Sequence, residues 1–131
     1  MIETELRTFI IAQLPSIYNS RIYPGILPQS VTLPALTYNR IDTEYNADLS
    51  GAIDHKMTAI QLTAVSDGII LTRADADALI DLLHGYKGLL DTVTALGIFV
   101  VGDNDLGYDN EEASDAKRYA IAIDIEIHYN D

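Results

Sequence analysis

The chain has 131 residues, 48% of them apolar, and its 20 acidic and 8 basic residues give a formal net charge of −12. This length predicts a single domain spanning residues 1–131 with one core, and no apolar run approaches the roughly 20 residues that cross a bilayer. The acidic balance argues against a protein that neutralises nucleic-acid phosphates, and the absence of cysteine excludes disulfides and thiol chemistry.

The first segment, residues 2–14, is predicted to form an amphipathic helix that ends at Pro15. Its acidic residues come early and no basic stretch precedes its apolar residues, which favours a helix over a signal peptide. The apolar stripe consists of Ile2, Leu6, Phe9, Ile10 and Leu14. Residues 15–34 then form a connection rich in proline, in which Pro24-Gly25 fits the central positions of a type II turn.

Two strands are expected next, at residues 35–42 and 55–66. Leu36, Tyr38 and Arg40 fall on one face of the first strand, because alternate side chains of a strand share a face. The second strand places Ile60, Leu62 and Ala64 on one face in the same way. Residues 43–54 between the strands are polar, and "DLSGAID", residues 48–54, is expected to form a loose turn.

Residues 72–87 carry the clearest helical pattern. Thr72 is a natural N-cap, and Asp75 stands three residues later, as in a capping box. Gly85 or Gly88 would end the helix.

The remaining chain predicts a short apolar strand at 96–102, an acidic loop at 103–116 and a strand at 118–130. The last segment, "RYAIAIDIEIHYN", alternates strictly and is the strongest strand signal in the chain. Whether this strand is central or at an edge stays open. Together the elements predict an α+β fold, with an antiparallel or mixed sheet of about four to five strands and two α-helices packed on one face.

The acidic loop invites a calcium interpretation, because Asp103 and Asp105 have the spacing that begins an EF-hand loop. That loop needs glycine at its sixth position and glutamate at its twelfth, where this chain has Tyr108 and Ser114. A solvated acidic loop explains the segment better.

Other catalytic patterns are weak. The three histidines share no ligand spacing, and no phosphate-binding loop or nucleophile elbow occurs. Asp124 and Glu126 could pair as acid and base, but the polar outer face of a half-buried strand explains them more simply. We therefore expect no enzyme, no metal and no cofactor.

The choice of aromatic residues is skewed, with eight tyrosines, two phenylalanines and no tryptophan. Tyrosine suits half-hydrated interfaces, and ordinary packing at the ends of elements explains the tyrosines equally well. Those in question are Tyr18, Tyr23, Tyr38, Tyr45 and Tyr108.

The stretch "RIYPGILPQSVTLPALTYNRID", residues 21–42, resembles the tail completion, or tail terminator, family of long-tailed bacteriophages and their prophage relatives. The residues that match the family pattern are Arg21, Ile22, Tyr23, Pro24, Gly25, Leu27, Pro28, Gln29, Leu33, Pro34, Ala35, Tyr38 and Arg40. The order and spacing of the other elements are compatible over the whole chain. The acidic segment 103–116 is this chain's own.

The resemblance implies a structural head–tail joining protein of the virion neck, assembled in the host cytoplasm. Such subunits form a ring, usually a hexamer, that caps the head-proximal end of the tail tube and ends tube polymerisation. The head connector docks on this ring, and DNA passes through it without specific binding, which an acidic wall would suit. Two alternatives stay open: a head-completion or tube protein of similar fold, and a metal-dependent enzyme using the carboxylates of residues 103–112.

For the ring, we expect the subunit and partner contacts to involve two groups of residues. They are Arg21, Tyr23, Pro24, Gly25 and Arg40 from the proline-rich stretch, and Asp103, Asp105 and Tyr108 from the acidic segment. Proline would hold the first group in one shape before assembly and so reduce the entropy lost on binding.

Overall fold

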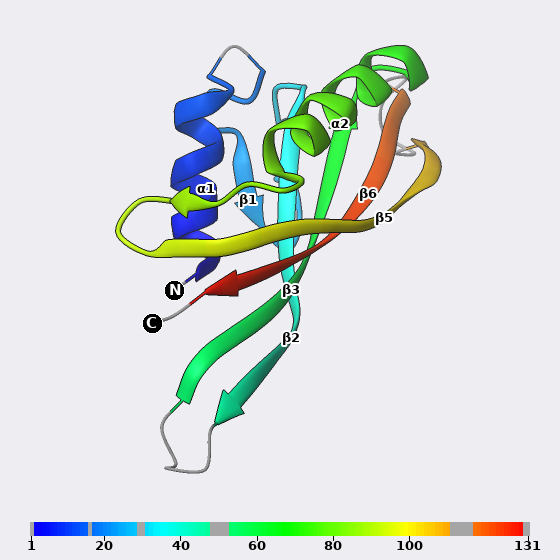
Figure 1. Cartoon of the computed structure of the whole chain (residues 1–131). Coiled ribbons are helices and arrows are strands. Elements are labelled where there is room, and N and C mark those ends of the chain that lie inside the picture. The colour runs from blue at the N-terminus through cyan, green and yellow to red at the C-terminus, as the bar shows by residue number, and fades with distance from the viewer. Residues whose placement is uncertain (1, 16, 29–30, 48–52, 111–116, 130–131) are drawn as a thin grey trace.

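Four long antiparallel strands form the centre of the fold (Figure 1). A computed structural model of the chain describes residues 2–15, 17–28, 31–47, 53–110 and 117–129. The sheet order is β1-β2-β3-β6-β5-β4. The long strands are β2 (Ala35–Ala47), β3 (Ile53–Ser66), β5 (Thr94–Asn110) and β6 (Lys117–Tyr129), and the helices are α1 (Ile2–Gln13) and α2 (Ile69–Leu83).

The α+β class is confirmed, and the sheet is mixed, one of the two expected forms, but it has six strands rather than four to five. The two extra strands lie at its edges: β1 (Ile22–Pro24) runs parallel to β2, and β4 (Gly88–Leu89) runs antiparallel to β5. Strands of two or three residues are too short to show an alternating pattern, so only their tertiary partners reveal them.

Strand β6 lies at the centre of the sheet, between β3 and β5, which answers the question its sequence left open. From Tyr119 to Tyr129 its odd-numbered residues are buried and face the two helices, whereas Asp124 on the opposite face is exposed. One core contains apolar residues of α1, α2 and this face of β3 and β6. We call the opposite face of the sheet, which carries Asp124, the outer face. Neither described helix has the length and hydropathy to span a bilayer.

Tyr18 belongs to this core and not to the surface, so the interface interpretation is wrong for this tyrosine. Its side chain is 0% exposed, and its hydroxyl has no hydrogen-bond partner among the described residues. Burial raises the pKa of Tyr18, and the nearby charge of Asp75 raises it further.

Replacing Tyr18 with phenylalanine is expected to raise the free energy of unfolding by about 1 kcal/mol, because it removes a buried hydroxyl that no group satisfies. Urea unfolding of the two proteins measures this difference. Tyr23→Phe is the matched control, since this half-buried ring changes little when its hydroxyl is lost. A less stable Tyr18→Phe variant would show that the hydroxyl has a stabilising partner.

Helix α2 begins at Ile69, directly after Gly68, and not at Thr72. The predicted N-cap is therefore wrong: Thr72 is a buried helical residue whose Oγ1 donates to the Gly68 carbonyl at 2.7 Å and lies 3.3 Å from the Tyr119 carbonyl. The capping-box spacing of Thr72 and Asp75 placed the predicted helix start three residues too late. The helix ends at Leu83 rather than at residue 87, and of the two glycines expected to end it, Gly85 follows the C-cap His84 with a φ of 80°.

Residues 103–110 are the second half of β5 and not a loop; residues 111–116 lie outside the described residues. The register of β5 against β6 shifts between Val100 and Gly102 and again between Asp105 and Gly107. Each shift inserts a residue that breaks the alternation of a strand, so the sequence showed no period there. The polar residues 43–47 continue β2, and β3 begins at Ile53; residues 48–52 of the expected turn at 48–54 lie outside the described residues.

Candidate assembly surfaces

The residues selected from the sequence lie at opposite sides of the sheet. Arg21, Tyr23, Pro24, Gly25 and Arg40 lie in or beside β1 and β2, at one edge. The acidic group, Asp103, Asp105 and Tyr108, lies on β5, with β3 and β6 between the two groups. The structure therefore defines two separate surfaces and no single site.

At the first surface, the Arg21 side chain holds the proline-rich connection in place through hydrogen bonds to two of its backbone carbonyls. Its Nε donates to the Pro34 carbonyl at 2.8 Å, and its Nη2 donates to the Ile17 carbonyl at 2.8 Å. The side chain thus joins the two ends of the connection and sets where β1 lies beside β2. Its role in subunit contacts remains a prediction.

The Pro24-Gly25 turn is tighter than a type II turn. Gly25 has a φ of 78°, as expected, but the Ile26 N–H donates to the Pro24 carbonyl at 3.0 Å, so three residues make the turn. The Gly25 N–H donates to the Tyr38 carbonyl at 3.0 Å, which holds the turn against β2. The turn leaves Ile26 86% exposed.

This loop borders a groove of about 320 Å³ on the outer face. The loop contributes Gly25, Ile26 and Leu27 to the groove, and the sheet contributes Thr37, Asn39, Thr63, Val65, Arg118 and Ala120. The proline-rich stretch therefore holds an apolar side chain beside an open groove.

Arg40 shares a face of β2 with Leu36 and Tyr38, as the alternation predicted, and this face meets the helices. Its guanidinium binds the carboxylate of Glu3 in α1, with Nε 3.0 Å from Oε1 and a second bond from Nη2. Glu3 is only 9% exposed, so this pair ties the start of α1 to the sheet.

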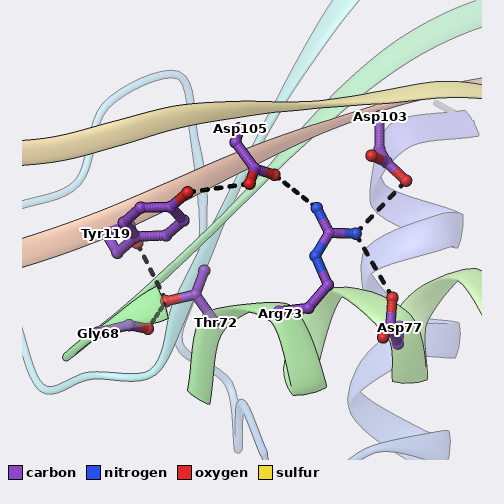
Figure 2. Close-up of polar contacts among 7 residues, drawn as sticks. All are labelled: Gly68, Thr72, Arg73, Asp77, Asp103, Asp105 and Tyr119. Carbon is purple, nitrogen blue, oxygen red and sulfur yellow. Dashed lines mark hydrogen bonds and ion pairs between the residues drawn. The ribbon is translucent and has the colours of Figure 1, made fainter. Parts of the chain in front are cut away.

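At the second surface, Arg73 of α2 lies among three carboxylates (Figure 2). Its Nη2 is 2.5 Å from Asp105 Oδ1, and its Nη1 is 3.5 Å from both Asp103 Oδ2 and Asp77 Oδ1. The Tyr119 hydroxyl donates to Asp105 Oδ2 at 2.9 Å. The bonds from Tyr119 and Arg73 hold the pKa of Asp105 below its usual value. We call these residues the Arg73 cluster.

Sequence reasoning missed Arg73. The spacing of four residues between Arg73 and Asp77 was a signal for a helical ion pair, but the partners on β5 come from the tertiary fold. Asp103 and Asp105 lie on strand β5 and bind Arg73, so they do not have the loop conformation that the calcium interpretation required. The described residues contain no group of three or more histidine, cysteine, aspartate or glutamate side chains that could hold a metal ion.

The described histidine side chains also have partners in the fold. His84 Nδ1 accepts the Val100 N–H at 3.0 Å. The ring of Phe99 lies between the two histidines, with its centroid 6.5 Å from that of His84 and 5.6 Å from that of His128. The side chain of His55 lies outside the described residues.

Asp105→Asn is expected to lower the free energy of unfolding at pH 7, and the loss should shrink below about pH 4. The folded-state pKa of Asp105 is lowered, so its contribution is present above the unfolded pKa of about 3.9 and is lost as the pH falls through the folded pKa. Urea unfolding at pH 7 and pH 3 measures both values. Asp81→Asn, an exposed change on α2, is the control. An equal loss at both pH values would contradict the expectation.

A solved structure supports this fold over its full length. A chain in the structure described as "Virion of native gene transfer agent (GTA) particle" matches with a TM-score of 0.67, covering 99% of this chain and 92% of that chain at 16% sequence identity. At this identity the likeness establishes the fold alone. No protein-family model matches the sequence, and no curated protein matches it.

Proposed function

We propose that this chain is a tail terminator: a ring subunit of the virion neck that caps the tail tube, ends its growth and receives the head connector. The observation that carries the proposal is the end-to-end likeness to a chain of a virion, which covers 99% of this chain. The resemblance of residues 21–42 to tail terminators adds the particular role.

The two assembly surfaces support a ring. They consist of different residues at opposite sides of the sheet. Two unlike surfaces join subunits head to tail, and such contacts close into a ring when the rotation between subunits permits it. A formal net charge of −12 fits a ring through which DNA moves without binding.

The first test combines oligomeric state with tube length. We expect light scattering at high protein concentration to show a ring, and a mixture with tube protein to give tubes of limited length. Negative-stain images should place the protein at one end of the tube. Protein that stays monomeric and leaves tube length unchanged would overturn the proposal. Binding elsewhere on the particle would indicate a head-completion protein, and self-assembled tubes would indicate a tube protein.

Ile26→Asp is expected to abolish ring formation without unfolding the subunit. Ile26 is 86% exposed, so the substitution costs little in the monomer, whereas a charge buried at a contact is strongly unfavourable. Light scattering and circular dichroism measure assembly and folding separately. Thr8→Asp, on the exposed side of α1, is the matched control. If Ile26→Asp still forms normal rings, the loop that carries Ile26 takes no part in the subunit contact.

A further inference from the structure

The two outer long strands each leave part of one edge unpaired within the described chain. Strand β1 covers β2 only at residues 36–38, and β4 covers β5 only at residues 94–95. The backbone of Gly85 and Tyr86 then bonds Ile98, and His84 bonds the Val100 N–H. Beyond these contacts, no described strand pairs with the outer edge of β2 at 41–47 or of β5 at 101–110. We call these stretches the β2 edge and the β5 edge.

We propose that the β5 edge of one copy pairs with the β2 edge of the next copy, so that the sheet continues from subunit to subunit. This inference rests on the proposed ring and specifies how its subunits join. An open strand edge presents backbone N–H and C=O groups to an incoming strand. Such an edge therefore binds an extended backbone, and a second copy supplies one in the edge strand that no described strand covers.

Strand direction favours this pairing. The order β2-β3-β6-β5 is antiparallel at every step, so β5 runs opposite to β2 within a subunit. Rotation about a ring axis keeps the sense of each strand along that axis. The β5 edge would therefore meet the next copy's β2 edge in an antiparallel sense, which continues the alternation already present in the sheet.

The offset of the two edges also suits a closed ring. The β2 edge is centred near Thr43, which pairs through Thr58 with Ile127 of β6, whereas the β5 edge is centred near Asp105, which pairs with Ile121. Six β6 positions, or roughly 20 Å, separate these levels, and four strands span roughly 19 Å across the sheet. Joining such edges tilts the strands by about 45°, at the upper end of the 35–45° usual in closed barrels.

The Arg73 cluster keeps the β5 edge open to a partner. Charged residues and bulges commonly protect edges from pairing, and β5 has both. However, Asp103 and Asp105 pair with Ile123 and Ile121, whose side chains face the helices, and Arg73 binds both carboxylates there. The two carboxylates therefore point toward the helices and not toward the open edge. The bulges of β5 mean that only a partner strand with a matching register can pair with this edge.

Cross-linking between single-cysteine variants tests the pairing, because the chain has no native cysteine. Glu44→Cys and Asn104→Cys lie near the centres of the two edges, and both positions are exposed. We expect a mixture of the two variants, treated with a short bismaleimide, to give a dimer that contains one of each. Either variant alone should give none, because unlike surfaces meet. The double variant should give a ladder of longer products.

A second pair, Ile41→Cys and Leu106→Cys, repeats the test at other positions of the same edges. It keeps the test valid if one of the first two variants does not fold. Both residues are inserted at register shifts and are 62% and 56% exposed. The control pair is Thr8→Cys with Asn104→Cys, which places one cysteine on α1. Cross-linking of either edge pair above the control supports the inference.

The outcomes separate this inference from the proposed function. Rings without cross-linking in either edge pair would overturn the edge pairing and leave the terminator role intact. Cross-linking of an edge cysteine only to a cysteine of added tube protein would show that another protein covers that edge, and would also overturn the edge pairing. A protein that stays monomeric and leaves tube length unchanged would overturn both.

Discussion

Replacing Ile123 with alanine is expected to lower the free energy of unfolding by about 3 kcal/mol. Ile123 is 0% exposed in the central strand β6, so the change removes buried apolar surface and leaves a cavity that the neighbouring strands cannot close. A domain of this kind has a total stability of about 5–15 kcal/mol, so this single change removes a large part of it. Urea or thermal unfolding of the isolated subunit measures the effect.

The adjacent residue supplies the control. Asp124 lies on the outer face, is exposed, and accepts a bond from Gln61 Nε2 at 3.2 Å. Asp124→Ala should change stability by less than about 1 kcal/mol, because an exposed polar contact contributes little. Equal losses from the two variants would mean that the outer face is also packed in the isolated subunit.

Replacing Arg21 with alanine is expected to cost about 2–3 kcal/mol of folding stability, because the Pro34 and Ile17 carbonyls both lose a bond from a charged donor. Arg21→Lys should recover only part of this loss, since an ammonium group cannot reproduce the two fixed directions of the guanidinium. Chemical unfolding of the monomer measures both variants.

The same variant separates two interpretations of Arg21. If Arg21 acts within the subunit, stability falls and assembly fails only as a consequence. If it acts mainly between subunits, the monomer of Arg21→Ala keeps its stability while light scattering shows loss of the ring. The second result would contradict the role that the two carbonyl bonds assign to it.

The sequence predicted those elements whose side chains repeat at a regular spacing. The alternation of β6 and the helical stripe of α1 identified both elements, because burial on one face imposes the period on the residues themselves. The central position of β6 and the second half of β5 could not be predicted in this way. The first depends on which strands pair, and the second is concealed by bulges at Val100/Gly102 and Asp105/Gly107.

The candidate surfaces were predicted less completely. The motif at residues 21–42 drew attention to Pro24 and Gly25, and the structure places them in an exposed turn beside a groove. The bonds from Arg21 to the Pro34 and Ile17 carbonyls could not be predicted, and neither could the Arg73 cluster. Each of them joins residues that only the fold brings together. Arg73 and Asp105 are 32 positions apart in the chain.

The central position of β6 has a consequence for synthesis in the cell. Strands β3 and β5 share no border until β6 enters between them, so the sheet cannot form until residues 117–129 have left the ribosome. Folding must then bring together strands far apart in the chain, which makes it slow compared with helical domains. A nascent chain therefore lacks the join between β3 and β5, and the edge pairing proposed above has to wait until synthesis has passed this strand.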